Sequence, residues 1–245
     1  MILYGTLGLC ALGAAFLVYR HDLYDREPVP LLALSVVLGA ALMALAGQAE
    51  SWVLEWSGVT SRPGIAAVAA VVEEILKLVT VVGVALLARK QFNDPLDGLI
   101  YGSMAGLGMA IEESAFYLRH GPRRPEVLPP VELARICGHL VMGGIGGFGV
   151  GLAAIGKRAW PFALAGGFFA AMGLHFAWDW LAISALDGGG LDPRHTLLGV
   201  AIMTGGLALY GALTAIGSGW SHGLFAPNRP ALLWGWPFNR AGRKI

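Results

Sequence analysis

Seven long apolar runs constrain the fold of this chain more than any other feature of its sequence. A helix crosses the hydrocarbon core of a bilayer with about 20 apolar residues. Charged residues make up only 13% of the 245 residues, whereas about a quarter is usual in a soluble domain. The sequence therefore predicts an all-α fold, a polytopic transmembrane helical bundle of about seven spans forming one membrane domain over residues 1–245. The runs cover, approximately, residues 2–19, 30–48, 64–88, 97–118, 132–156, 160–184 and 195–217.

The connections between these runs are polar and rich in proline and glycine, as loops are. The most loop-like of them is RHGPRRPEVLPP, at residues 119–130. Residues 50–61 are amphipathic and carry Trp52 and Trp56, so this segment could form an eighth helix lying along the membrane interface. Residues 218–245 hold further tryptophans and basic residues, and we expect them to form a C-terminal surface tail.

The distribution of lysine and arginine predicts the orientation of the chain in the membrane. With the N-terminus outside, ten of these residues fall in inner segments and six in outer ones. The positive-inside rule therefore favours an outer N-terminus and a cytoplasmic C-terminus. The net charge of +1 gives no reason to expect nucleic acid as a partner, and the expected surroundings are the lipid bilayer.

Several ionisable residues interrupt the apolar runs near their middles. An acidic or basic residue at the centre of a membrane helix costs about 2.5–3.5 kcal/mol on insertion scales, so these side chains must face each other, water or a metal. Lys77 could pair with Glu73 at i,i+4 or with Glu74 at i,i+3, in a purely structural network. Three other helices add more acids and two histidines to this network. Stability alone does not require them, because a buried ion pair rarely stabilises a protein more than apolar packing at the same place does. The interrupting residues are Glu73, Glu74, Lys77, Glu112, Glu113, His139, His175 and Asp179.

Depth in the membrane supports a shared site. Each of four residues lies within about ten residues of the outer end of its run, and at a rise of about 1.5 Å per residue they occupy one layer in the outer half of the membrane. His175 and Asp179 are also four residues apart, on one face of their helix. The four residues are Glu73, Glu113, His139 and His175.

In these segments the chain resembles the PrsW family of intramembrane proteases, distant relatives of the CAAX prenyl proteases. The family's EExxK motif is matched by residues 73–77. Its GLGFAxxEN..Y motif is matched by residues 106–117, its single histidine in the next span by His139, and its HxxxN motif by His175 and Asp179. The family's loop after the first helix and its entry to the second glutamate-bearing helix are matched by YDREP at 24–28 and DGLIYG at 97–102.

Four positions depart from the family pattern. Met109 stands where the family has phenylalanine, and Glu112 is an additional acid. Ser114 and Asp179 stand where the family has asparagine. An ionised Asp179 carboxylate cannot donate a hydrogen bond to an oxyanion, so Asp179 would have to be protonated to act there, or would instead orient His175.

The resemblance implies an intramembrane endopeptidase with its peptidase core at about residues 20–185. It implies a multi-pass protein of the bacterial inner membrane that cleaves a single-pass membrane protein, such as an anti-sigma factor, near the outer face. The catalytic residues that it implies are Glu73, Glu74, Glu113, His139 and His175, with Lys77, Asp179 and Tyr117 in support.

Two mechanisms fit these residues. The Glu73–Glu74 pair could supply a general base while the histidines donate to the oxyanion. Zinc could instead be held by candidates among Glu73, Glu113, His139 and His175, because histidine and glutamate are zinc ligands and the ion would activate a water. With no HExxH motif in the chain, we lean towards the metal-independent, glutamic-type form.

Three other functions compete with an intramembrane protease of this family. The first is a CAAX-type processing peptidase, against which Lys77 in EExxK argues. The second is a non-catalytic membrane protein. The third is a transporter with a proton or metal relay, since intramembrane acids and histidines also form relays. Related halves would favour a transporter, and the sequence contains none that we can identify.

Overall fold

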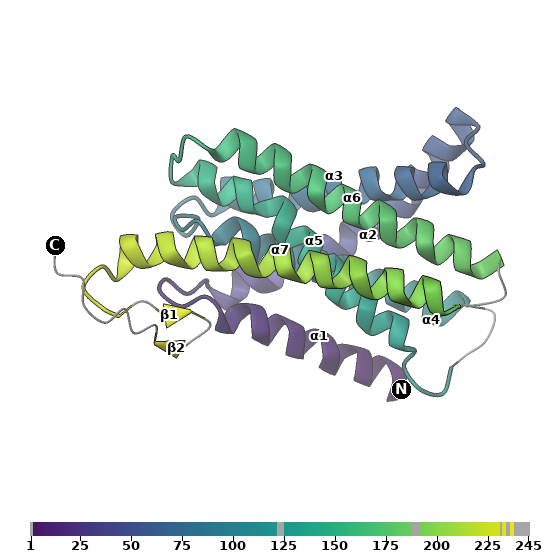
Figure 1. Ribbon diagram of the computed structural model, residues 1–245, viewed down its shortest axis with the longest axis horizontal. Helices are drawn as coiled ribbons and strands as arrows, with labels where there is room; N and C mark the ends of the chain where they lie inside the picture. Colours follow the sequence, from purple (N-terminus) through teal and green to yellow (C-terminus); the bar gives the residue numbers. More distant parts are fainter. Residues whose placement is uncertain (1, 122–124, 188–191, 231, 234–235, 238–245) are drawn as a thin grey trace.

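The computed structural model describes residues 2–121, 125–187, 192–230, 232–233 and 236–237. These residues form seven long helices, which confirms the predicted all-α bundle of about seven spans (Figure 1). Two strands of two residues each, β1 (Leu232–Leu233) and β2 (Trp236–Pro237), pair antiparallel after the last helix. The helices are α1 (Ile2–Arg20), α2 (Val29–Ser57), α3 (Arg62–Leu87), α4 (Asp97–His120), α5 (Pro130–Ala154), α6 (Trp160–Asp187) and α7 (Pro193–Phe225).

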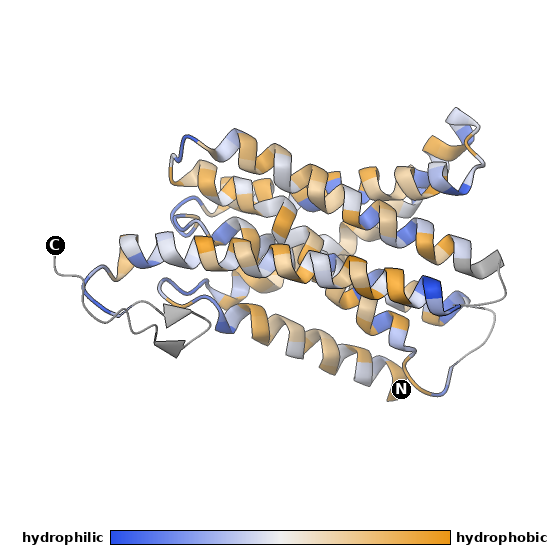
Figure 2. Ribbon diagram, in the orientation of Figure 1, coloured by the Kyte–Doolittle hydropathy of each residue, from blue (hydrophilic) through white to orange (hydrophobic). Residues whose placement is uncertain are grey.

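The outer surface of the bundle is apolar, as a bilayer requires. Helices α1, α2, α5, α6 and α7 are long and apolar enough to cross a membrane. The two remaining helices, α3 and α4, carry the acids and the lysine that interrupt the apolar runs: Glu73, Glu74, Lys77, Glu112 and Glu113. Hydrophobic residues cover most of the helix lengths, and hydrophilic residues gather mainly at the connections and helix ends (Figure 2). Large apolar side chains such as Leu9 and Phe162 are exposed, which places them in contact with lipid in a multi-pass membrane protein.

Helix α2 is longer than the sequence suggested. Residues 50–57 are its last two turns rather than part of a separate interfacial helix. The helix ends at Gly58, whose φ of 66° is left-handed and whose N–H donates to the Leu54 carbonyl at 3.0 Å. This is the usual glycine termination of a helix. The connection from α2 to α3 projects beyond the rest of the bundle (Figure 1).

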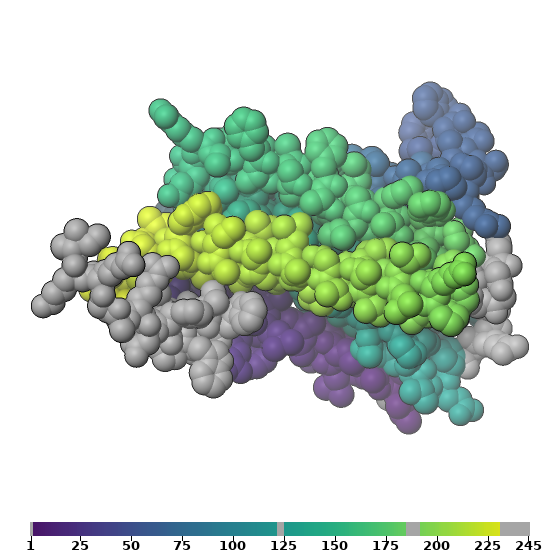
Figure 3. All heavy atoms as spheres, in the orientation of Figure 1, coloured from purple at the N-terminus to yellow at the C-terminus, as the bar shows by residue number. Residues whose placement is uncertain are grey.

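Helix α7 also extends further than its apolar run. The surface tail was expected to begin at residue 218, but the helix continues to Phe225, and Ser218 and Ser221 are buried. A side chain at Gly217 would come within 2.4 Å of Leu96, so α7 packs closely on the segment that leads into α4. In the space-filling view α7 runs across the visible face, with α1 below it (Figure 3).

Glycines bring the backbones of α4 and α5 into direct contact. A Cβ atom at Gly102 would lie 2.1 Å from the Gly143 carbonyl oxygen, and one at Gly106 would lie 2.0 Å from that of His139. One turn earlier, Gly98 meets Gly147 in the same way. Small residues spaced by one turn allow membrane helices to approach this closely. The contact therefore fixes an antiparallel register that sets the glutamate-bearing end of α4 against the first half of α5.

Helix α2 packs on the other side of α4 by the same means. A Cβ atom at Gly39 would lie 2.1 Å from the Ala105 carbonyl oxygen, and one at Gly108 would lie 2.0 Å from that of Val36. Helix α3 follows α2 and precedes α4 in the chain, and the short connections 58–61 and 88–96 make it run opposite to both. Helices α2 and α4 therefore run in the same direction. Helix α4 is thus held between two helices in backbone contact with it.

Four carboxylates are buried at the opposite end of the bundle, where the loop after α1 meets the loop before α4. Asp22 accepts a hydrogen bond from the Glu27 N–H at 2.5 Å, and Asp94 accepts one from the Leu96 N–H at 2.8 Å. Asp97 accepts from the N–H groups that precede it in the same loop. Within the described residues, no ion pair neutralises these acids. Asp22, Asp94 and Asp97 thus cap loop backbone, whereas the fourth acid, Glu27, accepts a hydrogen bond from the Tyr101 hydroxyl. All four lie in or close to the segments 24–28 and 97–102.

Burial changes the ionisation of Asp22, in the loop after α1, and of Asp94, in the loop before α4. It raises the pKa of Asp22 from 3.8 to about 7 and the pKa of Asp94 from 3.8 to about 6. Desolvation is the largest cause, and neighbouring carboxylates such as Asp25 add to it. Both acids therefore disfavour the folded state once they are ionised.

The α4–α5 contact predicts a strong effect of Gly102→Ala. The added methyl group would meet the backbone of α5, and overpacking of this kind costs about 1–3 kcal/mol. Gly205→Ala is the matched control, because nothing lies within 4 Å of that exposed position in α7. We expect thermal melting in detergent to show a lower melting temperature for Gly102→Ala, and an equal or higher one for Gly205→Ala. Equal melting temperatures for both variants would argue against the contact.

The loop carboxylates predict a pH-dependent stability. Because the pKa values of Asp22 and Asp94 are higher in the folded than in the unfolded chain, stability falls as pH rises from about 4 to about 7 and then levels off. Each kcal/mol lost lowers the melting temperature by about 2–4 °C in a chain of this size. Asp22→Asn, which keeps the acceptor for the Glu27 N–H, should flatten the curve of melting temperature between pH 5 and 8. A variant curve parallel to that of the unaltered protein contradicts the prediction.

Candidate active site

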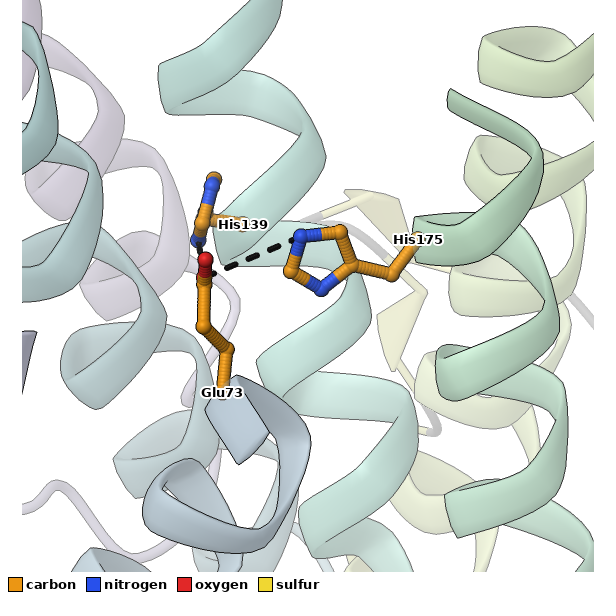
Figure 4. A group of neighbouring side chains, drawn as sticks. All are labelled: Glu73, His139 and His175. Atoms are coloured by element: carbon orange, nitrogen blue, oxygen red, sulfur yellow. Dashed lines mark ion pairs between the residues drawn. The ribbon is translucent and has the colours of Figure 1, made fainter. Parts of the chain in front are cut away.

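Three helices bring a glutamate and two histidines together inside the bundle. The Glu73 Oε2 atom of α3 lies 3.6 Å from His139 Nδ1 of α5 and 3.7 Å from His175 Nε2 of α6. Figure 4 shows the Glu73 carboxylate pointing toward both imidazole rings. All three side chains are buried. The sequence predicted that these residues share a layer of the membrane, and in the structure they are neighbours.

Each histidine is held by a carboxylate at its other ring nitrogen. His139 Nε2 lies 2.9 Å from Glu113 Oε2, and His175 Nδ1 lies 2.8 Å from Glu74 Oε1. The ring centroids are 5.2 Å apart and the rings are nearly perpendicular. A carboxylate bound to one ring nitrogen fixes the orientation of an imidazole and leaves the other nitrogen free to act. The second nitrogen of each ring faces Glu73, and that of His175 also lies 3.3 Å from Asp179 Oδ2.

Glu74 is itself paired with Lys77. The Lys77 Nζ atom lies 2.5 Å from Glu74 Oε1, and both side chains are almost fully buried. Of the two pairings that the sequence allowed, the structure therefore contains the i,i+3 pair. Lys77 supplies the positive charge that a buried carboxylate needs, because an unpaired charge in an apolar interior is costly.

Glu113 is restrained by Arg135, which was not among the predicted site residues. The Arg135 Nε atom lies 3.2 Å from Glu113 Oε1, and its guanidinium also pairs with Glu132. The same guanidinium lies 4.6 Å from the centroid of the Tyr117 ring, in a cation–π contact. A signal for Arg135 was present in the sequence, since it lies four residues before His139 and hence on the same helix face.

Two other predicted residues fall at the edge of the site. Asp179 Oδ2 lies 3.3 Å from His175 Nε2, and its side chain is 24% exposed. Glu112 points away and pairs with Arg119 at 3.2 Å on the exposed side of α4. Asp179 can therefore act on His175, whereas Glu112 takes no part in the cluster.

Glu50 lies within α2, although the sequence placed it in an interfacial segment. Its carboxylate interacts electrostatically with His175, Glu113 and Asp179. The Oε1 atom is buried and has no hydrogen-bond partner in the described part of the chain.

The cluster of Glu73, His139 and His175 fits a divalent metal. The donor atoms of these residues lie within 4.8 Å of one another. Glu73 Oε2 and His139 Nδ1 are buried and have no hydrogen-bond partner among the described residues. Neighbouring ligands in a tetrahedral zinc shell, with bonds of about 2.0–2.1 Å, are about 3.4 Å apart. The observed separations of 3.6 and 3.7 Å are close to that spacing.

Comparisons with known proteins find similarity to proteases. A family model described as PrsW family intramembrane metalloprotease matches residues 27–209. Protease PrsW of Geobacillus kaustophilus (strain HTA426) is 28% identical over 176 residues, which cover 70% of this chain and 76% of that relative. No solved structure matches the chain.

The buried Lys77–Glu74 pair predicts a distinctive pair of variants. Lys77→Met leaves the Glu74 charge without its partner, which typically costs about 3–5 kcal/mol. Adding Glu74→Gln removes that charge, so the double variant should recover most of the lost stability. Thermal melting in detergent measures both. The pairing is contradicted if Lys77→Met melts like the unaltered protein, or if the double variant melts no higher than the single one.

Proposed function

This chain belongs to the PrsW family of intramembrane proteases, and from that premise we propose that it hydrolyses membrane-anchored proteins at the buried glutamate–histidine cluster. The observation that carries the proposal is the arrangement of the two histidines. Each has one ring nitrogen held by a carboxylate and the other turned toward Glu73. The residues of the proposed site are Glu73, Glu74, Glu113, His139 and His175, with Lys77, Asp179, Tyr117 and Arg135 in support.

We propose that Glu73, His139 and His175 hold a zinc-like ion. A bound ion of this kind lowers the pKa of a water molecule and polarises the carbonyl group that the water attacks. Support comes from the buried donor atoms without partners and from the carboxylate behind each histidine, which is the common environment of metal-binding imidazoles. These features favour the metal-dependent mechanism over the metal-independent one, towards which the sequence leaned.

The other charged groups have positioning roles in this proposal. Glu74 is engaged by Lys77 and by His175 Nδ1, so it orients His175 and does not take a proton from water. Glu113, restrained by Arg135, orients His139 in the same way. Asp179 contacts His175 from the more accessible side and limits the movement of the ring.

The position of the cluster along the helices supports cleavage near one face of the membrane. Glu113 lies seven residues from the end of α4, and Glu73 lies eleven residues after the start of α3. At a rise of about 1.5 Å per residue, this places the cluster roughly 10–17 Å from the helix ends. With an outer N-terminus in a bacterial inner membrane, these ends face outward. We therefore propose a single-pass membrane protein as the substrate, for example an anti-sigma factor, cut near the outer face.

Variants of the cluster separate metal-holding residues from positioning residues. We expect Glu73→Gln, His139→Ala and His175→Ala to lose cleavage by about 10³-fold or more, and to lose bound metal. Glu74→Gln and Glu113→Gln should weaken metal binding by about 10–100-fold, because they act through the histidines. The exposed His120 serves as the control, and His120→Ala should behave like the unaltered protein.

The measurement combines the purified protein, a panel of single-pass membrane substrates and metal analysis of each variant. Cleavage that survives in the Glu73→Gln, Glu74→Gln double variant would contradict the proposed site. Cleavage by a protein that binds no metal would contradict the metal-dependent mechanism while leaving the protease function in place.

A further inference from the structure

Two segments that the proposed hydrolytic site does not use meet at the opposite end of the bundle. They are YDREP at 24–28, in the loop after α1, and DGLIYG at 97–102, at the start of α4. The Tyr101 hydroxyl of the second segment donates a hydrogen bond to Glu27 Oε2 of the first. We propose that Glu27 and Asp97 share one proton, and that this protonated pair holds the loop after α1 on the first turn of α4.

The two carboxyl groups of this pair are buried and in contact. Glu27 and Asp97 are 3% and 1% exposed, and their side chains are hydrogen-bonding partners of each other. Tyr101 lies four residues after Asp97 and hence on the same face of α4. Helical side chains also lean toward the N-terminus of their helix. The Tyr101 hydroxyl that binds Glu27 therefore lies back toward Asp97, which brings the two acids together.

The hydrogen bonds of Asp97 indicate which oxygen carries the proton. Asp97 Oδ2 accepts hydrogen bonds from the N–H groups of Asn93 and Asp94, at 2.6 and 2.7 Å. The other oxygen, Oδ1, is buried and accepts no hydrogen bond from any described residue. A protonated carboxyl group has one oxygen that donates its hydrogen, while the other oxygen only accepts. The proton is therefore on Asp97 Oδ1, and it is donated to the Glu27 carboxylate.

The charges around the pair differ from those around the other buried acids. Glu73 and Glu113 also have an oxygen without a donor, but both face a histidine. Neither Glu27 nor Asp97 takes part in an ion pair among the described residues. Two buried carboxylates in contact cannot both be ionised without a large cost, so one proton is retained. The titratable groups of the surrounding segments are His21, Asp22, Asp25 and Arg26 of the loop after α1, Asp94 of the loop before α4, Tyr101 of α4 and His222 of α7.

The pair lies where α4 begins its contact with α5. Gly98 follows Asp97 directly, and a Cβ atom at Gly98 would lie 2.1 Å from the Gly147 carbonyl oxygen. Loss of the shared proton would leave two ionised acids side by side. Their repulsion would separate the loop after α1 from α4, next to this helix–helix contact. The pair is thus a proton-dependent switch that is closed while it holds the proton.

Infrared spectroscopy of the purified protein in deuterated buffer at pH 8 tests this inference. An ordinary carboxyl group, with a pKa of about 4, is ionised at this pH, so the carbonyl band of a carboxylic acid reports only a retained proton. We expect Asp97→Asn and Glu27→Gln each to lose one such band. Either amide donates the hydrogen bond that the pair needs and leaves the remaining carboxyl ionised. Asp192→Asn, at an exposed position before α7, is the control and should lose none.

Thermal melting at the same pH distinguishes a proton from a metal ion. The two amide variants should melt no lower than Asp192→Asn, whereas Asp97→Ala, which cannot bridge to Glu27, should melt lower. Retention of the band in either folded amide variant overturns the inference, and so does failure of both to fold. It is also overturned if calcium or magnesium chloride raises the melting temperature of the unaltered protein but not of Asp97→Asn, because the ligand would then be a divalent cation. None of these measurements requires a substrate, so their outcome is independent of the proposed function.

Discussion

The backbone contact between α4 and α5 determines the geometry on which the proposed site depends. Three glycines of α4, at 98, 102 and 106, meet the α5 backbone so closely that a methyl group would not fit at any of them. In a bilayer, close packing of this kind replaces the hydrophobic effect as the force that joins helices. The register places His139 opposite Gly106, and its ring consequently meets Glu113 at 2.9 Å. A larger separation of the two helices would break the carboxylate–histidine pair.

Charge balance is the second constraint on the bundle interior. Lys77 and Arg135 each neutralise one carboxylate that in turn orients a histidine. The charged groups are thus arranged as a cation, a carboxylate and an imidazole in series, once on each side of Glu73. A series of this kind satisfies buried charges and also aims two ring nitrogens at one point. The structural network that the sequence allowed as an alternative and the proposed hydrolytic site are therefore built from the same residues.

The sequence predicted the helices and the central cluster because both depend on composition and depth. Seven apolar runs became seven helices, and Glu73, His139 and His175 share a depth that residue spacing along a helix can estimate. Which face of each helix points inward depends on packing, so the engaged partners of each histidine could not be assigned. The count of lysine and arginine placed Arg135 among the outer segments, although it lies inside the run 132–156. Glu50 fell in the interfacial segment because α2 continues beyond its apolar run. The buried acids at the opposite end come from loops, which helix periodicity does not describe.

The central claim is that Glu73, His139 and His175 together hold a metal at which the peptide bond is hydrolysed. X-ray absorption spectroscopy at the zinc edge tests it most directly, on active protein purified without chelators. The account predicts a zinc shell with two imidazole nitrogens and at least one carboxylate oxygen at about 2.0–2.1 Å, and one imidazole fewer in any zinc that His139→Ala retains. A fully active protein with no bound metal, or a shell without histidine nitrogen, would contradict it.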